Sequence, residues 1–314
     1  FVCDYGQYHE VVLNASSELY SFKPNYIYFH ISIENLNLYH LGEKQSSEIA
    51  NDEFSKLEDM WSKIHERIDC QIIQDNFELP SIRSLGSFDA YSSSGVSSVI
   101  TELNALISGA AEKYSFLQLS DRNYLSSKVG LANWKDYFLW VTAKYSLSYL
   151  AITHICYSIS QVIISLLGKS KRCMVLDLDN TLWSGVIGDD GVDGINLGND
   201  NPIGEAFLDF QRYIKQLKDR GIILAVCSKN EINVAKTGFD HPDSLLKVSD
   251  FTSFKANWEL KSKNIVEIAK EINIGLESIV FVDDNPVERD IVRQDLNGKV
   301  SVPELGQDVT TYRD

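Results

Sequence analysis

The apolar run CMVL at positions 173–176 constrains the fold most, because two aspartates come directly after it, Asp177 next to the run and Asp179 two residues further on. Four consecutive apolar residues predict a strand that is buried on both faces, as in a parallel sheet. Strand side chains alternate between faces, so both carboxylates should lie on one side, at or just beyond the strand's carboxyl end. Ligands bind at that edge in open α/β sheets.

Two carboxylates this close repel each other unless a positive charge lies between them, and a hard divalent cation suits oxygen ligands. The alternative is that one aspartate caps the next helix while its neighbour is solvated. That alternative accounts for one aspartate at a strand end better than for two, so we interpret the pair as functional.

Strand and helix signals alternate along the whole chain, which predicts an α/β protein with parallel sheets flanked by helices. In the first half we expect strands at 26–33, 70–77 and 115–121 and helices at 51–68, 94–114 and about 146–167. In the second half we expect strands at 173–178, 222–228, 245–248, 278–284 and 299–302 and helices at 204–220 and 258–272. The basic connector GKSKR at 168–172 marks the boundary, so the predicted domains are 1–168 and 169–314.

The composition excludes some classes of protein. The chain has 314 residues, which is enough for two domains, and its net charge of −15 argues against a nucleic-acid partner. Its five cysteines are scattered without a C-x-x-C motif, which indicates a reducing compartment and a cytoplasmic location. The apolar stretch 137–167 is interrupted by Lys144 and His154, so we expect a buried helix and no membrane span. Because the chain opens with Phe1, we expect the first domain to be N-terminally truncated.

Further polar residues follow the later strands. Ser228, Lys229 and Asn230 come after 222–228, Lys261 lies near the start of a helix, and Asp283 and Asp284 follow 278–284. If these strands are parallel neighbours, the groups converge at one edge. Phosphoryl transfer needs such a set: a nucleophilic carboxylate, a second carboxylate for proton transfer, Mg²⁺, and a hydroxyl and a lysine for the phosphoryl oxygens.

Each of these residues also has a simpler interpretation. Lys261 could be one solvated charge among several lysines, Ser228 could cap a helix, and Lys229 and Asn230 could only shape a turn. Three aspartates of the segment GDDGVDG are expected to be turn residues of a small β-hairpin flap: Asp189, Asp190 and Asp193. The intervals between the motifs leave no room for a separate cap domain. Trp183 and Trp258 are expected to be packing residues, although Trp183 could wall the site.

The D-x-D-x-T sequence from Asp177 to Thr181 resembles the first motif of the haloacid dehalogenase (HAD) superfamily of phosphatases and phosphotransferases. Ser228, Lys261 and the pair Asp283–Asp284 are similar to its second, third and fourth motifs. The resemblance implies that Asp177 is the nucleophile and Asp179 the general acid/base. It implies a phosphate site that includes Thr181, Ser228, Lys229, Asn230 and Lys261. It also implies Mg²⁺ held by Asp177, the backbone carbonyl of Asp179 and one aspartate of the pair Asp283–Asp284. We favour Asp284 as the direct ligand, with Asp283 behind it, and the sequence leaves that choice open.

The longer strings VLDLDNTLWSGVIGDDG, NWELKSKNI and FVDDNPVERD resemble the FkbH-like subfamily. That resemblance implies removal of phosphate from a phosphorylated three-carbon acyl donor, 1,3-bisphosphoglycerate, and transfer of a glyceryl group to an acyl carrier protein. The first half is similar to the SGNH-hydrolase-like domain of that subfamily. It has no G-D-S serine motif and no D-x-x-H dyad, so we expect a docking or acyl-recognition domain. A simple phosphomonoester phosphatase and a scaffold with a vestigial site remain as alternatives.

Overall fold

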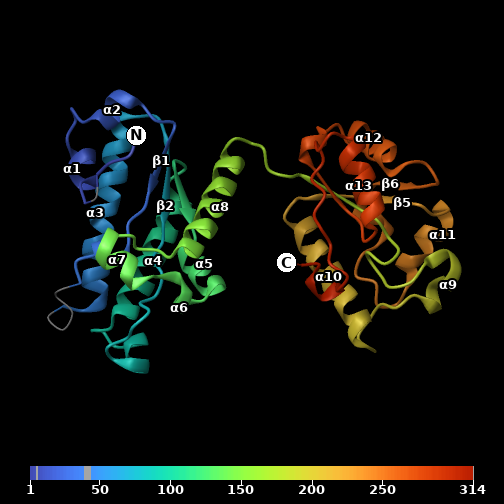
Figure 1. The fold of residues 1–314 in the computed structure, drawn as a ribbon, viewed down its shortest axis with the longest axis horizontal. Helices are drawn as coiled ribbons and strands as arrows, with labels where there is room; N and C mark the ends of the chain where they lie inside the picture. Colours follow the sequence, from blue (N-terminus) through green and yellow to red (C-terminus); the bar gives the residue numbers. More distant parts are fainter. Residues whose placement is uncertain (5, 39–43, 314) are drawn as a thin grey trace. The chain divides into compact units, whose positions relative to one another are not determined.

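The computed structural model describes residues 1–4, 6–38 and 44–313. The chain divides into two compact units, Phe1–Leu166 and Leu167–Asp314. Each unit is a parallel sheet with helices packed against it (Figure 1). This confirms the predicted α/β class.

Within the described residues, the first unit contains a sheet in the order β1-β2-β3, with Tyr26 opposite Gln71 and Ile72 opposite Leu117. Its strands are β1 (Tyr26–Phe29), β2 (Gln71–Asp75) and β3 (Leu117–Ser120). Its helices are α1 (Tyr8–Leu13), α2 (Glu18–Phe22), α3 (Ser46–Arg67), α4 (Val96–Lys113), α5 (Arg122–Val129), α6 (Leu131–Trp134), α7 (Tyr137–Ala143) and α8 (Tyr149–Leu166).

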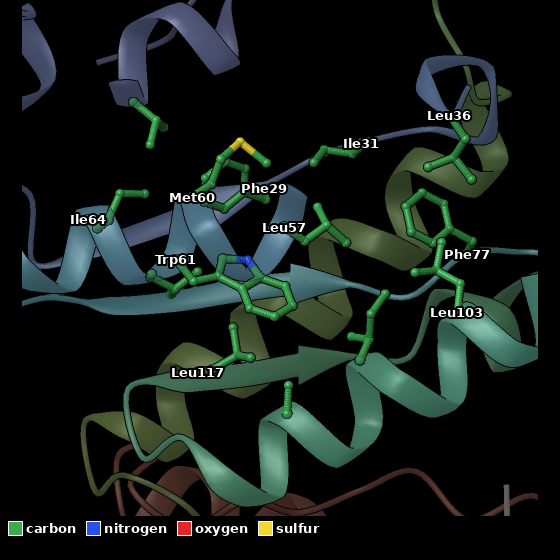
Figure 2. Packing of buried hydrophobic residues seen from close by; sticks show 14 of the residues in the cluster. Phe29, Ile31, Leu36, Leu57, Met60, Trp61, Ile64, Phe77, Leu103 and Leu117 are labelled. Carbon is green, nitrogen blue, oxygen red and sulfur yellow. The ribbon is translucent and has the colours of Figure 1, made fainter. Parts of the chain in front are cut away.

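The main core of the first unit lies between the sheet and the helices α3 and α4 (Figure 2). Leu57, Trp61 and Ile64 recur at helical spacing and therefore form one apolar stripe on α3. Trp61 is fully buried in this core, and its Nε1 donates a hydrogen bond to Oε1 of Gln74 at 3.1 Å. The indole thus fills the core and satisfies its polar atom at the same time.

Two boundaries in the first unit differ from the prediction. Helix α3 begins at Ser46 because Gln45 and Glu48 form a reciprocal cap, in which Glu48 accepts from the Gln45 N–H at 3.0 Å. Strand β1 ends at Phe29, short of the predicted residue 33. The following segment turns because the side chain of Asn35 accepts from the backbone N–H of Ser32 at 3.0 Å.

The expectation that 137–167 contains a buried helix is wrong. Helix α8 contacts α5, α6 and β3 through a narrow stripe, and among its residues only Ala151 and Ile155 are buried. A three-stranded sheet is too small to cover more of the helix. By length and composition α8 could also cross a membrane, and one helix with these properties is weak grounds for a span.

In the second unit the described residues form a parallel sheet in the order β6-β5-β4-β7. Its strands are β4 (Cys173–Leu176), β5 (Ile223–Ser228), β6 (Phe251–Ala256) and β7 (Ile279–Val282). Its helices are α9 (Ile187–Gly194), α10 (Pro202–Asp219), α11 (Ile232–Thr237), α12 (Lys261–Glu271) and α13 (Pro286–Asp295). The central strand β4 therefore has a neighbour on each side.

Alternate residues of β4 enter two separate cores. Val175 packs with α12 and α13 on one face of the sheet, and Leu176 packs with α10 on the other. Both faces are covered, which explains why this strand is apolar without alternation. The burial of β4 leaves its carboxyl end as the place where polar side chains can emerge.

Two expected strands in the second unit are wrong. At 245–248 the backbone N–H groups of Leu245 and Leu246 donate to Oε1 of Gln211 at 3.0 and 3.2 Å, so a buried side chain replaces the sheet ladder. The strand forms later, as β6. At 299–302 a single parallel bridge joins Ser301 to Val280.

Replacement of Trp61 by alanine should destabilise the first unit strongly. Loss of a fully buried indole leaves a cavity and removes the hydrogen-bond donor to Gln74. We therefore expect the free energy of unfolding to fall by about 3–5 kcal/mol. Urea denaturation followed by circular dichroism would measure the change. Tyr137→Ala removes a side chain that is 78% exposed and should change stability by less than about 0.5 kcal/mol. Equal effects of the two substitutions would contradict the assigned core.

Candidate active site

Asp177 is fixed directly beside the end of β7. Its backbone N–H donates to the carbonyl of Val282 at 3.0 Å, which extends the pairing of β4 and β7 by one residue. Asp283 follows Val282 in the chain. The parallel register therefore brings together two aspartates that are 106 positions apart in the sequence. Both are buried, with 7% of Asp177 and none of Asp283 exposed to solvent.

Lys261 joins these two carboxylates. It is the first residue of α12, and its Nζ lies 2.9 Å from Oδ2 of Asp177 and 2.6 Å from Oδ2 of Asp283. Only 3% of the residue is exposed, so the alternative of a solvated lysine is wrong. Burial by itself lowers the pKa of Lys261, but Asp177 and Asp283 outweigh it and raise that pKa above the ordinary value for lysine. The side chain is a fixed positive charge at the site.

Three carboxylates are close enough to share one cation. One oxygen each from Asp177, Asp283 and Asp284 lie within 4.8 Å of one another. Burial, followed by the charge of Asp177, raises the pKa of Asp283 to about 6 against the opposing effect of Lys261, and the same two causes raise the pKa of Asp284. Oδ1 of Asp177 is buried and accepts no hydrogen bond from the residues that the structure describes. This set of hard oxygen donors fits a divalent cation.

Asp179 has a different set of partners from Asp177. Its Oδ1 accepts hydrogen bonds from Nε1 of Trp183 at 3.0 Å and from the backbone N–H of Ile187 at 2.9 Å. Its Oδ2 accepts from Nδ2 of Asn230 at 2.7 Å. Three donors from two separate segments therefore fix the orientation of this carboxylate.

Ser228 and Asn230 lie at the carboxyl end of β5, next to Asp179. Asn230 also donates to Oγ of Ser228 at 3.2 Å, so its amide links the serine to the aspartate. Both residues are buried, at 2% and 5% exposure. The structure thus brings Ser228 and Asn230 into the predicted group, and Asn230 does more than shape a turn.

Two of the predicted residues contact neighbours of the site. Oγ1 of Thr181 donates to Oδ1 of Asp284 at 3.2 Å and accepts from the Asp284 backbone N–H at 3.2 Å. Lys229 forms an ion pair with Glu288 of α13 at 2.5 Å. Thr181 therefore holds Asp284 in place, and the charge of Lys229 is directed to a carboxylate outside the aspartate cluster.

The expected hairpin flap is largely helical. Within 183–196 one antiparallel bridge joins Ser184 to Asn196, and the residues between form α9 with a kink at Gly191. Asp190 is not a hairpin turn residue, because its Oδ2 accepts from the backbone N–H of Val186 at 2.7 Å inside the helical segment. No large cap occurs among the described residues of this unit, as the sequence predicted.

The two tryptophans differ. Trp183 is fully buried and binds Asp179, and a side chain added at Gly238 would lie 2.5 Å from its ring. Gly238 therefore permits the close approach that sets the indole against Asp179. Trp258 is 77% exposed, so the expectation that it packs is wrong.

Sequence reasoning missed Arg289. Its guanidinium, 4% exposed, donates to the backbone carbonyls of Asp283 and Asp284 at 2.7 and 2.8 Å and thereby fixes both aspartates. An arginine one helical turn inside α13 was a usable signal, because its side chain can reach back to the preceding loop. Glu288, the partner of Lys229, was missed as well.

The fold and this edge define a class: α/β proteins that gather aspartates and a lysine at the carboxyl ends of a parallel sheet. Residues 1–164 match the family model described as FkbH, N-terminal domain. A crystal structure of the N-terminal part of a Bacteroides fragilis protein, containing a phosphatase domain and complexed with Mg, is 34% identical to this chain. The match has a TM-score of 0.88 and covers 99% of this chain and 82% of that one. The chain therefore belongs to the FkbH family.

Two other solved structures are less similar. A HAD family enzyme from Bacteroides thetaiotaomicron is 16% identical with a TM-score of 0.29, and the match covers 44% of this chain and 97% of that one. A 3-deoxy-D-manno-octulosonate 8-phosphate phosphatase from Moraxella catarrhalis is 16% identical with a TM-score of 0.27, over 47% and 77% of the two chains. Neither similarity carries an argument. A search of curated proteins finds no match.

Replacement of Lys261 by alanine should destabilise the second unit in a pH-dependent way. Without the lysine, Asp177 and Asp283 face each other unpaired, so we expect a loss of about 3–5 kcal/mol at pH 7.5 in the absence of metal. Removal of Lys261 also removes the charge that lowers the pKa of Asp283, so in the variant this pKa should lie above its value of about 6 in the intact site. Proton uptake by Asp283 should therefore make the loss smaller at pH 5 than at pH 7.5. Urea denaturation at both pH values would test this.

Lys263→Ala is the matched control, because its side chain is 65% exposed on the same helix and pairs only with Glu259. It should change stability by less than about 1 kcal/mol at either pH. A Lys261→Ala protein as stable as this control would contradict the described pairing.

Proposed function

We propose that the second unit is a Mg²⁺-dependent phosphatase or phosphotransferase of the HAD type, in which Asp177 attacks phosphorus. The observation that carries the proposal is how the two oxygens of the Asp177 carboxylate are partnered. One oxygen is held by Lys261, and the other is buried without a partner in the described structure, beside Asp283 and Asp284. The phosphatase domain and Mg of the B. fragilis structure support this proposal.

In this proposal Mg²⁺ is held by Asp177, Asp284 and the backbone carbonyl of Asp179. Asp283 is the less suitable direct ligand, because its Oδ2 binds Lys261 and its Oδ1 accepts from the backbone N–H of Asn285 at 2.9 Å. Bound Mg²⁺ would supply positive charge that offsets the repulsion between the Asp177 carboxylate and a phosphate.

Asp177 forms the new bond to phosphorus while the bond to the leaving oxygen breaks, and Asp179 donates a proton to that oxygen. Asp179 then takes a proton from the water that attacks the aspartyl phosphate, which restores Asp177 and releases phosphate. Trp183, Ile187 and Asn230 orient Asp179 for both transfers.

Lys261 and Ser228 are the proposed phosphoryl-binding groups. The ammonium has three N–H donors and uses two of them for Asp177 and Asp283, so the third can bind a phosphoryl oxygen. The hydroxyl of Ser228 accepts from Asn230 and keeps its own O–H for donation. Thr181 and Lys229, which bind Asp284 and Glu288, act in this proposal through those partners.

For the substrate we propose a phosphoglyceryl donor, with transfer of the glyceryl group to an acyl carrier protein. Membership of the FkbH family supports this choice. The short segment 183–196, which contains only α9 between its bridged ends, also supports it, since a site without a large cap admits a bulky carrier.

Intact-protein mass spectrometry tests both levels of the proposal. The protein is incubated with Mg²⁺, 1,3-bisphosphoglycerate and a carrier protein that bears its phosphopantetheine arm. A glyceryl adduct on the carrier supports acyl loading. Phosphate release without any adduct supports a simple phosphatase and removes the carrier from the proposal.

Asp177→Asn should lower phosphate release by at least about 1,000-fold, because an amide is a far weaker nucleophile than a carboxylate. Asp189→Asn changes an exposed aspartate of α9 and should leave the rate within about twofold. Phosphate release by a colorimetric assay measures both. Undiminished phosphate release by Asp177→Asn would contradict the assignment of Asp177 as the nucleophile. Unchanged biological activity of a variant that no longer releases phosphate would support the scaffold alternative.

Binding of Mg²⁺ should strengthen as the pH rises through about 6. Asp284, the proposed ligand, must lose its proton before it binds the cation, and burial and the charge of Asp177 raise its pKa. Asp283 lies beside the site with a pKa of about 6, and its negative charge adds to the attraction for the cation once it has lost its proton. We expect the association constant to rise about tenfold per pH unit below 6 for each proton released, and to level off above 7. Titration calorimetry in two buffers of different ionisation enthalpy would count the protons. An affinity that is constant from pH 5 to 7 would exclude this coupling.

A further inference from the structure

A second group of polar side chains gathers in the first unit, again at the carboxyl ends of parallel strands. His30 follows the last residue of β1, Asp75 is the last residue of β2, and Ser146 lies in the loop between α7 and α8. Strand alternation turns Phe29 into the main core and Tyr28 toward the small cluster around α8. Asp75, adjacent in the chain to the core-facing Gln74, lies on the same face as Tyr28.

The distances order these residues as nucleophile, base and acid. Oγ of Ser146 lies 3.0 Å from Nε2 of His30, and Nδ1 of the same ring lies 3.5 Å from Oδ2 of Asp75. The imidazole is 39% exposed, whereas the Asp75 side chain is fully buried. A hydroxyl, an imidazole that solvent can reach and a buried carboxylate are the parts of a serine-nucleophile site.

Tyr28 bridges the base and the acid. Its hydroxyl donates to Oδ2 of Asp75 at 2.5 Å and lies 3.2 Å from Nδ1 of His30. Burial, followed by the charge of Asp75, raises the pKa of Tyr28, so the phenol keeps its proton and remains a donor to Asp75. Its oxygen can then accept from an Nδ1–H of His30, which leaves Nε2 free to accept the proton of Ser146.

Buried contacts hold this arrangement in place. Arg122 is fully buried, donates to the carbonyl of Ile31 at 3.0 Å, and pairs with Glu78 through its Nε at 2.8 Å. Arg122 is the first residue of α5, the helix after β3, so this hydrogen bond connects the backbone next to His30 to α5. Oδ1 of Asp75 is buried and has no hydrogen-bond partner among the described residues. Oδ2 of Asp75 also lies 4.0 Å from Nη1 of Arg122, so the buried carboxylate faces a guanidinium as well as the imidazole of His30.

A cavity of about 980 Å³ opens beside these residues and includes Tyr28, His30 and Ser146 in its walls. Most of its wall is apolar, with contributions from α2, β1 and α8: Leu19, Phe22, Ile27, Phe29 and Ile152. A space of this size and character suits a hydrocarbon chain.

The backbone N–H groups of Ser146 and Leu147 have no hydrogen-bond partner in the part of the chain that the structure describes. Both residues also line the cavity. Backbone N–H groups without a partner, at and beside a nucleophile, are suitable donors for the oxyanion of a tetrahedral intermediate.

We propose that Ser146, His30 and Asp75 form a second active site, which cleaves esters of apolar acyl chains. Oγ of Ser146 bonds to the ester carbonyl carbon while His30 Nε2 takes the hydroxyl proton. The carbon–oxygen bond to the alcohol breaks, and the alcohol leaves with that proton. Water then attacks the acyl-serine, gives its proton to Nε2, and the carboxylic acid leaves as the proton returns to Ser146. No oxidant or metal enters this balance.

His30 and Ser146 are 116 positions apart in the chain, so no local serine or histidine motif marks this site in the sequence. It is independent of the proposed phosphatase activity, because it shares no residue with that site and lies within the first unit.

Covalent labelling tests the nucleophile in the full chain. An alkyl fluorophosphonate with a ten-carbon chain bonds to an activated serine and releases fluoride. Peptide mass spectrometry of the labelled wild-type protein should place the adduct on Ser146. Labelling should disappear in Ser146→Ala and persist in Ser160→Ala, whose serine donates only to a carbonyl of its own helix, α8. The adduct on the wild-type peptide decides the question even if a variant fails to fold. A folded wild-type protein without an adduct on Ser146 overturns the proposal.

Ester kinetics separate the base from the positioning residue. With p-nitrophenyl octanoate, His30→Gln should lower kcat by at least about 100-fold, because the general base is lost. Tyr28→Phe should lower kcat by about tenfold with KM unchanged, because phenylalanine keeps the ring in the cavity wall and loses only the hydroxyl that orients the imidazole. The acetate ester should be cleaved with a lower kcat/KM than the octanoate. Equal rates for wild type and His30→Gln, or a faster acetate reaction, would overturn the assignment.

Discussion

The second unit depends on one compensated cluster of charge. Asp177 and Asp283 are nearly removed from water, and Lys261 lies between them at 2.9 and 2.6 Å. A buried pair of carboxylates without such a partner would take up protons or destabilise the fold. The lysine offsets their mutual repulsion at the place where the parallel strands end. Arg289 and Thr181 then fix Asp284 and the loop that carries it.

The same geometric rule produced both candidate sites. In each unit, parallel strands end together, and side chains from distant parts of the sequence meet there. The second unit places all its groups within one run of βα units. The first unit places His30 and Asp75 on neighbouring strands and takes Ser146 from a loop after three helices. The two edges therefore differ in how much of the site is visible in local sequence.

That difference explains what could be predicted from the sequence. The apolar run before Asp177 and Asp179 predicted a buried parallel strand. The residues after β7 predicted aspartates that meet Asp177, and the residues after β5 predicted groups that meet Asp179. The sequence could not show that Lys229 pairs with Glu288, since only the position of α13 decides it. The strand expected at 245–248 failed because one side chain, Gln211, takes its backbone donors. The prediction that α8 is buried was wrong because apolar composition indicates how much surface a helix can bury. How much of α8 is buried depends on the small sheet and the helices beside it.

The Lys261 contacts bear on whether the second unit can fold before a metal ion binds. The cluster already contains one built-in positive charge, and the two cores beside it are packed from the chain's own side chains, mostly apolar, without a metal ligand among them. The chain can therefore complete its fold first and acquire an ion afterwards, as an independent step. Metal supply would then govern how many molecules are active, while the number of folded molecules stays constant. Zinc fingers behave in the opposite way, because their folding itself waits for the ion.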